Sequence, residues 1–496
     1  MPTEIKTPPS AEEGKRLRNV SLYLIPVVIG NIIPFFTLPL FTRALSAADY
    51  GLLALAQAFA TSVAGFANFG LNTVYDRSFH QYREPSKAAA LLYSCVGFVA
   101  LLLLLCTAVT AVFHRPISML VFGSTAYGGL ALWGLASLGV LKLETFFYAR
   151  LRNSEHASEF AFFTILESCL DALFGITLVV ILRKGPAGLL IGPLMSGIIV
   201  TIVMSARTLR RLPFALDRSV FLHTLALSAP LVPLMFAGIL SSQLDKYLVG
   251  RMNSLEGAGL YGIGQRIAMV GFSYMTALSN VFFPRIYRMM FDKDLEAADD
   301  IGRYLTPFFV FSLAAPLCIA LFSEELLKIL TPPSYHPAAE LVSILCLYYG
   351  LQFFGKTPQI MYRGKGGLLS VLGFLNLPLN LLFGLPLVLL WGARGAALAL
   401  LAAGAIQMTI FFILSQRSYP IGWEYRKIGP LLAYFFAAVA ITFPLHTLLT
   451  TAPYFLCKLA LAGGFFALAH VQDALPPTPL REMLSRLPKL WGNPSK

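Results

Sequence analysis

The chain has 496 residues, of which 57% are hydrophobic and 13% charged, and its net charge is +13. Soluble domains carry about 25% charged residues, and the mean hydropathy here is +0.70. This composition excludes an ordinary soluble domain and predicts an all-α integral membrane protein. The six cysteines lie in apolar stretches without a CxxC pair, and the seven histidines show no ligand spacing. We therefore expect no disulfide, no metal and no cofactor.

Fourteen apolar stretches are long enough to cross a bilayer, which takes about 20 helical residues. They lie at 20–42, 50–72, 89–113, 119–141, 159–182, 187–206, 221–248, 258–282, 303–322, 338–357, 367–390, 395–415, 429–449 and 453–471. Polar tails, 1–19 and 472–496, flank them. The largest connections, such as 73–88 and 283–302, leave no room for a soluble catalytic domain, and no Walker lysine follows a glycine-rich loop. We predict a transporter or scaffold rather than an enzyme.

Lysine and arginine residues alternate between the two sides of the predicted membrane. With the N-terminus inside, 27 of the 38 basic residues fall in cytoplasmic segments and eight in outside loops. This is the positive-inside pattern, and it predicts that both termini are cytoplasmic. It also accounts for the net positive charge without a nucleic-acid partner.

Two regions of the chain carry polar residues in the same order. After an arginine at the end of one helix come a serine, an acid, a Tyr-Gly pair, a glutamine, an asparagine and a second arginine. The first copy is Arg43, Ser46, Asp49, Tyr50-Gly51, Gln57, Asn68 and Arg77, and the second is Arg251, Ser254, Glu256, Tyr261-Gly262, Gln265, Asn280 and Arg285. Chance similarity between apolar segments is the alternative, and the shared order favours duplication.

Prolines interrupt the helix that precedes each copy, namely Pro26, Pro34 and Pro39 in the first and Pro230 and Pro233 in the second. Six helices separate the copies, so the repeats should be parallel. We predict two pseudo-symmetric six-helix lobes, 20–206 and 221–415, facing one another across a cavity, with helices 429–449 and 453–471 outside the repeat. Broken helices at matching places point to the transport pathway, unless the prolines merely bend packed helices.

The stretches LFTRALSAADYGLLALAQAF and LDKYLVGRMNSLEGAGLYGIGQRI resemble signature regions of the polysaccharide-biosynthesis exporters. These are the Wzx-type lipid-linked oligosaccharide flippases of the multidrug/oligosaccharidyl-lipid/polysaccharide superfamily. The resemblance implies a MATE-like, V-shaped pair of lobes in the bacterial inner membrane. It implies alternating-access transfer of an undecaprenyl-pyrophosphate-linked O-antigen, capsule or exopolysaccharide unit to the periplasmic leaflet. Membrane lipid and the polysaccharide polymerase and chain-length machinery are the implied partners.

Charged residues within the predicted helices are functional candidates, because a charge at mid-bilayer costs roughly 2.5–3.5 kcal/mol. Arg266 is the leading candidate for binding the phosphates, and a buried ion pair is its alternative. Lys356 either faces the cavity or extends to the cytoplasmic interface. Arg43, which resembles the helix-1 arginine of the family, either contacts substrate or anchors a loop through Asp49.

Four further charged residues lie near the ends of the predicted helices. Arg77 and Arg285 occupy matching places at the inner mouths, where they either meet phosphate or serve as positive-inside anchors. Asp245 and Lys246, near the outer end of their helix, either form a gate between the lobes or pair locally.

Glu167 and Asp171 stand four residues apart, which places them on one helix face near mid-membrane. Two like charges there favour protonation of at least one carboxyl. Coupling to H⁺ or Na⁺ is one hypothesis, and static pairing with an arginine of the same lobe is the other.

Several other functions remain open. A multidrug exporter of the same superfamily usually has twelve helices, and a peptidoglycan lipid-precursor flippase carries a more arginine-dense first helix. A membrane glycan polymerase or ligase would need a long periplasmic loop with reactive groups, which the sequence does not show. A structural scaffold does not require the repeated broken helices.

Overall fold

The structure is a computed structural model that describes residues 30, 33–79, 81, 82, 84–356, 358–364, 371–448 and 450–475. Throughout these ranges the regular elements are all helical, which confirms the predicted all-α class. Twelve stretches within them are long and apolar enough to cross a membrane. The predicted first span is described mainly through helical residues 33–44, and Pro26 lies outside the described residues. The number fourteen therefore stays a prediction.

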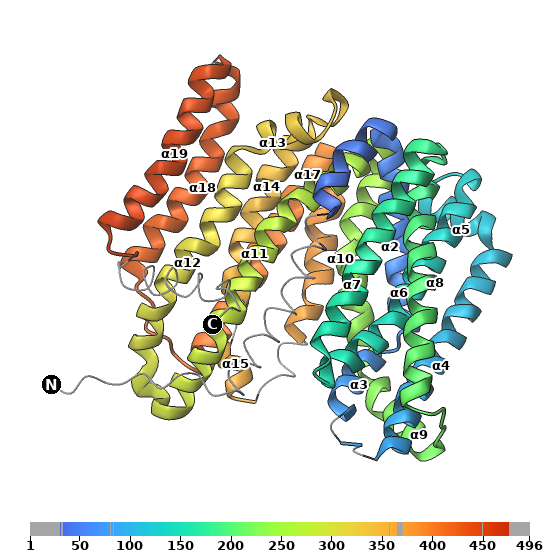
Figure 1. Cartoon of the computed structure of the whole chain (residues 1–496). Coiled ribbons are helices and arrows are strands. Elements are labelled where there is room, and N and C mark those ends of the chain that lie inside the picture. Colours follow the sequence, from blue (N-terminus) through green and yellow to red (C-terminus); the bar gives the residue numbers. More distant parts are fainter. Residues whose placement is uncertain are drawn as a thin grey trace, which may run out of the picture.

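The first lobe consists of long helices with short ones at their ends. After residues 33–44 come α2 (Ala47–Ala67), α3 (Leu71–Phe79), α4 (Pro85–Val112), α5 (His114–Phe122), α6 (Gly128–Asn153), α7 (Ala157–Ile176) and α8 (Gly188–Arg211). Helix α6 lies at the centre, in contact with α2, α4 and α8 (Figure 1). Leucines of α4 such as Leu104 and Leu105 are exposed, as expected of a surface that faces lipid.

The second half of the chain builds the other lobe and the C-terminal pair. Its helices are α9 (Arg218–Ser228), α10 (Val232–Met252), α11 (Leu255–Lys293), α12 (Ala298–Leu321), α13 (Ser323–Leu330), α14 (Ala338–Leu351), α15 (Pro358–Tyr362), α17 (Asn376–Ser418), α18 (Tyr425–Leu448) and α19 (Thr451–Val471). Its core is the contact of α11 with α12 and α14, which bury residues such as Phe309, Leu313 and Ile344.

Helix α17 contains two of the predicted spans. At about 1.5 Å per residue, the 48-residue stretch Val371–Ser418 would be more than twice as long as the bilayer core is thick. Gly392 breaks it with φ 56° and ψ −130°. A Cβ at Gly395 would overlap the Leu387 carbonyl, so the chain turns back on itself there. The break lies between the predicted helices 367–390 and 395–415.

Two predicted boundaries were wrong because glycine turns interrupt the apolar runs. The predicted span 119–141 begins inside α5, which ends at Gly123 with φ 76°. The membrane-crossing stretch is Thr125–Asn153 instead. Similarly, the predicted span 50–72 is divided at Phe69 and Gly70, both in the left-handed region, into α2 and α3.

The internal repeat has a constant spacing at its helix starts. Ser46 caps α2 and Ser254 caps α11, each through its side-chain oxygen. These serines stand 208 positions apart (254 minus 46), and so do Arg43 and Arg251, Gln57 and Gln265, and Arg77 and Arg285. In this register Gly51 matches Gly259 rather than Gly262, so the predicted pairing of the Tyr-Gly dipeptides was three residues out. The equal cap positions support duplication.

The two equivalent helices α2 and α11 cross closely where they begin. A Cβ at Gly51 would overlap the Leu255 carbonyl oxygen, and one at Gly259 would overlap that of Ala47, so the backbones touch. Tyr335 adds a hydrogen bond from its hydroxyl to the Leu45 carbonyl, 2.6 Å. This end of the bundle carries α5 and α13, whereas α3, α9 and α15 lie at the other end (Figure 1). We call it the outer end, because its loops are the predicted periplasmic ones.

The helix before α11 is broken, as its prolines predict. A 3₁₀ turn at Ala229–Leu231 separates α9 from α10; Pro230 lies within this turn and Pro233 in the first turn of α10. Helix α9 packs against α3 and α4 of the first lobe, whereas α10 packs against α17 and α2. This helix therefore links the lobes at the inner end.

The C-terminal pair α18–α19 is fastened to the second lobe. Helix α18 packs on α12. The fully buried Lys458 ammonium lies 3.0 Å from the Glu325 carboxylate and 3.7 Å from that of Glu324 on α13. It also lies 4.0 Å from the centre of the Tyr454 ring. We expect the pair to move together with the second lobe.

Candidate functional site: a cavity between the lobes

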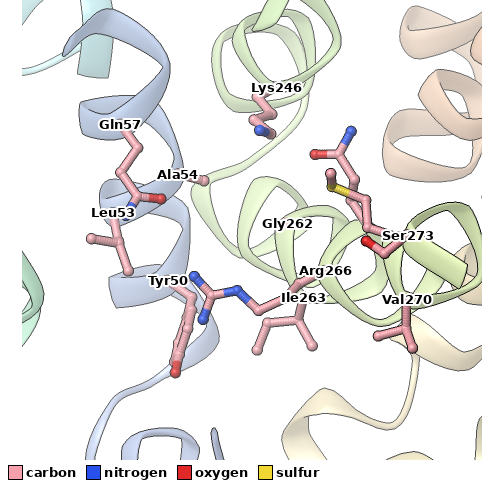
Figure 2. A pocket seen from close by; sticks show the side chains of 12 residues that line it. Tyr50, Leu53, Ala54, Gln57, Lys246, Gly262, Ile263, Arg266, Val270 and Ser273 are labelled. Atoms are coloured by element: carbon pink, nitrogen blue, oxygen red, sulfur yellow. The ribbon is translucent and has the colours of Figure 1, made fainter. Parts of the chain in front are cut away.

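A cavity of about 270 Å³ lies where α2 of the first lobe faces α10 and α11 of the second. We call it the central cavity. It is lined by Tyr50, Leu53, Ala54, Gln57, Lys246, Gly262, Ile263, Gln265, Arg266, Met269, Val270 and Ser273 (Figure 2). The repeat places one glutamine from each lobe, Gln57 and Gln265, on its wall.

Arg266 is the main cation of the central cavity. Figure 2 shows its side chain extending from α11 toward α2, beside Tyr50, while Lys246 enters the same space from α10. No ion pair of Arg266 occurs among the described residues, so its predicted alternative, a buried pair, is not seen there. Its guanidinium group therefore keeps its hydrogen-bond donors available for an anionic ligand.

Two further chambers open next to the central cavity. The C-lobe chamber, about 370 Å³, shares Lys246, Gln265 and Met269 with it and is otherwise lined by α10, α14, α17 and their neighbours. The N-lobe chamber, about 230 Å³, shares Leu53, Gln57 and Arg266 with it. It extends to Asp171 on α7 and to Thr37 on the first helix. The central cavity therefore adjoins a chamber on each side through shared wall residues.

Asp245 and Lys246 bond within their own lobe. The Tyr261 hydroxyl donates to the Asp245 carboxylate, and the Lys246 backbone N–H donates to the same group at 3.0 Å. The Lys246 ammonium donates to the Gln243 side chain at 3.2 Å. No bond from either residue to the first lobe occurs in the described part of the chain, so the structure favours local bonding over a gate. Lys246 nevertheless reaches the central cavity.

A group of three carboxyls lies at the N-lobe chamber, with Asp171 on its wall, Glu167 and Asp171 half-buried and Glu144 fully buried. The Glu167 carboxylate accepts a hydrogen bond from the Tyr148 hydroxyl at 2.5 Å. Asp171 accepts one from the Ser196 hydroxyl. Neither acid has an ion pair among the described residues, so the predicted static pairing with an arginine is not seen there.

Glu144 completes this group, and the sequence analysis missed it. Its side chain is fully buried, and Thr201 donates to its Oε1 at 3.1 Å. Its Oε2 is buried without a hydrogen-bond donor in the described structure, while the Glu167 carboxyl lies within hydrogen-bonding reach. The predicted fourth span ended at residue 141, which put Glu144 in a cytoplasmic loop. The helix α6 in fact continues to Asn153. Glu144 therefore lies about two turns before the end of the helix, and an acidic residue at that place was the signal that could have revealed it.

The sequence was compared with known protein families. A family profile described as polysaccharide biosynthesis protein matches residues 16–290, which is more than half of the chain. The chain belongs to this family. The resemblance inferred from the two signature regions is thereby confirmed.

Relatives and solved structures agree with the membership. A protein of Haloferax volcanii named probable low-salt glycan biosynthesis flippase Agl15 is 23% identical over 421 residues, covering 81% of this chain and 84% of that protein. The lipid II flippase MurJ in an inward closed conformation superposes with a TM-score of 0.71 at 15% identity, over 90% of this chain and 98% of MurJ. An inward-facing MATE multidrug transporter gives 0.58 at 15% identity, over 80% and 97%. The predicted MATE-like fold of two lobes is confirmed.

The other three arginines predicted as candidates for substrate binding do not line these spaces. Arg43 is exposed at the outer end, and Asp49, its expected partner, instead accepts bonds from Ser46. Arg77 is exposed at the inner end. Arg285 lies there too, with its guanidinium 4.5 Å from the centre of the Tyr304 ring.

Lys356 lies below the C-lobe chamber rather than on its wall. Its ammonium lies 3.4 Å from the Thr276 hydroxyl and 5.2 Å from the centre of the Phe272 ring. Of the five basic residues predicted to bind substrate, only Arg266 lines the cavity, and their roles remain predictions.

Proposed function

We propose that this protein is a flippase that transfers an undecaprenyl-pyrophosphate-linked oligosaccharide from the cytoplasmic to the periplasmic leaflet of the bacterial inner membrane by alternating access. One observation carries the proposal: the polar cavity between the lobes presents Arg266 and Lys246, and neither has an ion pair among the described residues. The glycan-biosynthesis relative and MurJ are both named flippases, which supports the same class of transport for this protein.

The chemistry of the headgroup explains why such a cavity is needed. Each sugar hydroxyl removed from water without a partner costs on the order of 1–3 kcal/mol, and an ionised pyrophosphate costs far more. Arginine suits phosphate because its planar donors bind two oxygens at once. Arg266 and Lys246 would hold the pyrophosphate in the central cavity, while the isoprenoid tail stays in the surrounding lipid.

The N-lobe carboxyls supply a coupling site in this proposal. Two carboxyl groups within hydrogen-bonding reach, buried and without a cation, are stable when they share a proton. We assign that proton to Glu144 and Glu167, and Asp171 connects the group to the N-lobe chamber. Na⁺ is the alternative ion. Release of the proton would accompany the change between inward and outward states.

Two other transport substrates fit the same fold. A peptidoglycan lipid precursor has the same pyrophosphate chemistry, and the MurJ likeness keeps it open. A multidrug exporter is disfavoured for cationic drugs, because the positive charges of Arg266 and Lys246 on the wall of the central cavity would repel them. We further expect cytoplasmic termini, and the polysaccharide polymerase and chain-length machinery as partners in the membrane.

The test is a leaflet assay with the full-length protein in proteoliposomes. Three substrates are compared: an undecaprenyl-pyrophosphate-linked oligosaccharide, lipid II and ethidium. The proposal predicts protein-dependent transfer of the first, with loss of transfer in Arg266→Gln. Transfer of lipid II alone or of ethidium alone, each at normal protein level, would overturn it in favour of the corresponding alternative.

A further inference from the structure

The C-lobe chamber differs in chemistry from the central cavity that it adjoins. Among its fourteen lining residues, Asp245 and Lys246 alone are of the charged types, and they are adjacent and opposite in charge. The rest of the wall is amide, hydroxyl and aromatic side chains, with few aliphatic ones. Its volume of about 370 Å³ falls within the range of small-molecule sites, about 300–1,000 Å³.

The amides of the chamber come from four separate helical segments, one of which is α11 with Gln265. Gln243 lies on α10, Gln352 in the 3₁₀ turn Gln352–Gly355 that follows α14, and Asn376 and Asn380 at the start of α17. Asn380 is nine-tenths buried and uses its amide N–H groups to bond Ser241 at 3.2 Å and Asn376 at 3.1 Å. Its carbonyl oxygen receives no donor among the described residues and remains able to accept.

Several polar groups of the wall are similarly unused. The Gln352 side-chain amide makes no hydrogen bond in the described part of the chain, and the Asn376 side-chain N–H groups have no acceptor there. An amide offers two donors and an acceptor with two lone pairs, which matches the hydroxyl and N-acetyl groups of sugars. In a membrane interior such groups are costly unless a ligand or water satisfies them.

Aromatic rings form the other side of the chamber. Phe272 and Tyr349 lie 5.6 Å apart between ring centres, and Tyr348 lies 5.1 Å from Tyr349. A pyranose ring has an apolar C–H face that packs on an aromatic ring and a hydroxyl edge that bonds to amides. The wall therefore offers both surfaces that a sugar requires.

We propose that the C-lobe chamber is the glycan subsite, which holds uncharged, hydroxyl- and N-acetyl-bearing sugars next to the pyrophosphate, while Arg266 and Lys246 hold the phosphates in the central cavity. Lys246 and Gln265, which line both spaces, stand at the junction between phosphate and first sugar. The net charge of the chamber is near zero, so it selects neutral over acidic sugars. This inference rests on the proposed flippase function and names its specificity residues.

The test measures binding to the full-length protein in detergent with three probes: undecaprenyl pyrophosphate, the same lipid carrying a neutral trisaccharide, and the same lipid carrying an acidic trisaccharide. Wild type should bind the neutral glycolipid most tightly. The variant Gln352→Ala/Asn376→Ala removes two hydrogen-bonding side chains and should bind the neutral glycolipid about tenfold more weakly. Its affinity for the bare lipid should not change. Arg266→Gln should weaken all three probes.

Controls separate the possible failures. Gln416→Ala removes an amide of α17 that bonds the Ile421 backbone away from the chamber, and it should leave all affinities unchanged. If wild type binds none of the lipids, the flippase function fails and the subsite fails with it. Two results would show that the proposed glycan subsite alone is wrong. Either the wild-type protein binds the neutral glycolipid no more tightly than the bare lipid, or it binds the acidic glycolipid more tightly than the neutral one. An equal loss of affinity for the bare lipid and for the glycolipid in the double variant would also contradict the subsite.

Discussion

A single methyl group at Gly259 should open the outer end of the bundle. A Cβ there would overlap the Ala47 carbonyl and approach the Gly51 backbone nitrogen, and neither neighbour is a side chain that can rotate away. Helices α2 and α11 would have to separate. Overpacking of this kind costs about 1–3 kcal/mol, which shifts a two-state equilibrium by about 5–150-fold. Gly259→Ala should therefore shift the protein toward a state with the outer end open.

The shift can be measured by cysteine labelling from outside. A reporter Ala54→Cys lines the central cavity, in a background from which the six native cysteines are removed. With Gly259→Ala, a membrane-impermeant maleimide added to the periplasmic side should label the reporter at least about fivefold faster. Gly97→Ala is the matched control, because a Cβ at Gly97 meets open space. Unchanged labelling in a folded Gly259→Ala protein would show that this crossing does not hold the outer end closed.

Three further predictions concern charged groups. Arg266→Ala should slow transport of the lipid-linked oligosaccharide by about 10–150-fold, as expected for a lost charge-assisted bond, with Arg266→Lys retaining more; full transport in the alanine variant would exclude an essential substrate role. Glu144→Gln should make transport in vesicles insensitive to collapse of the pH gradient, whereas a response like that of wild type would exclude proton sharing with Glu167. Lys458→Met should lower stability to denaturant by about 3 kcal/mol, because it removes the ammonium that lies 3.0 Å from the Glu325 carboxylate; an additional Glu325→Gln should restore part of the loss.

The helices were predictable because length and hydropathy alone decide what can cross a bilayer. The ends of the helices were less predictable, because turns at Gly123 and Gly70 divide apolar runs that look continuous in the sequence. One displaced end also hid a site residue: Glu144 was assigned to a loop when it lies within α6. The internal repeat was recognised from its polar residues, and the serine caps of α2 and α11 give these residues equivalent places in the structure.

Arg266 was predictable as a cavity residue because a charge inside a membrane helix needs a polar surrounding. Lys246 was predicted only as a gate or a local pair, and its place on the cavity wall comes from the structure. The C-lobe chamber was not predictable from the sequence, because its amides are uncharged and lie far apart in the chain. Asn380 and Ser241 are 139 positions apart and meet only after α10 packs on α17. Arg43 belongs to a signature stretch, and Arg77 and Arg285 match in the internal repeat. All three lie at the ends of the bundle, where a charge costs little.

The central claim is that the chain carries a lipid-linked glycan across the membrane, and the leaflet in which that lipid accumulates tests it most directly. In cells that lack the protein, lipid-linked repeat units should accumulate in the cytoplasmic leaflet, inaccessible to a periplasmic glycan-modifying reagent. Restoring the wild-type gene, but not the Arg266→Ala variant, should make them accessible. Accumulation of the same units in the periplasmic leaflet would contradict the account and indicate a defect in a later step such as polymerisation.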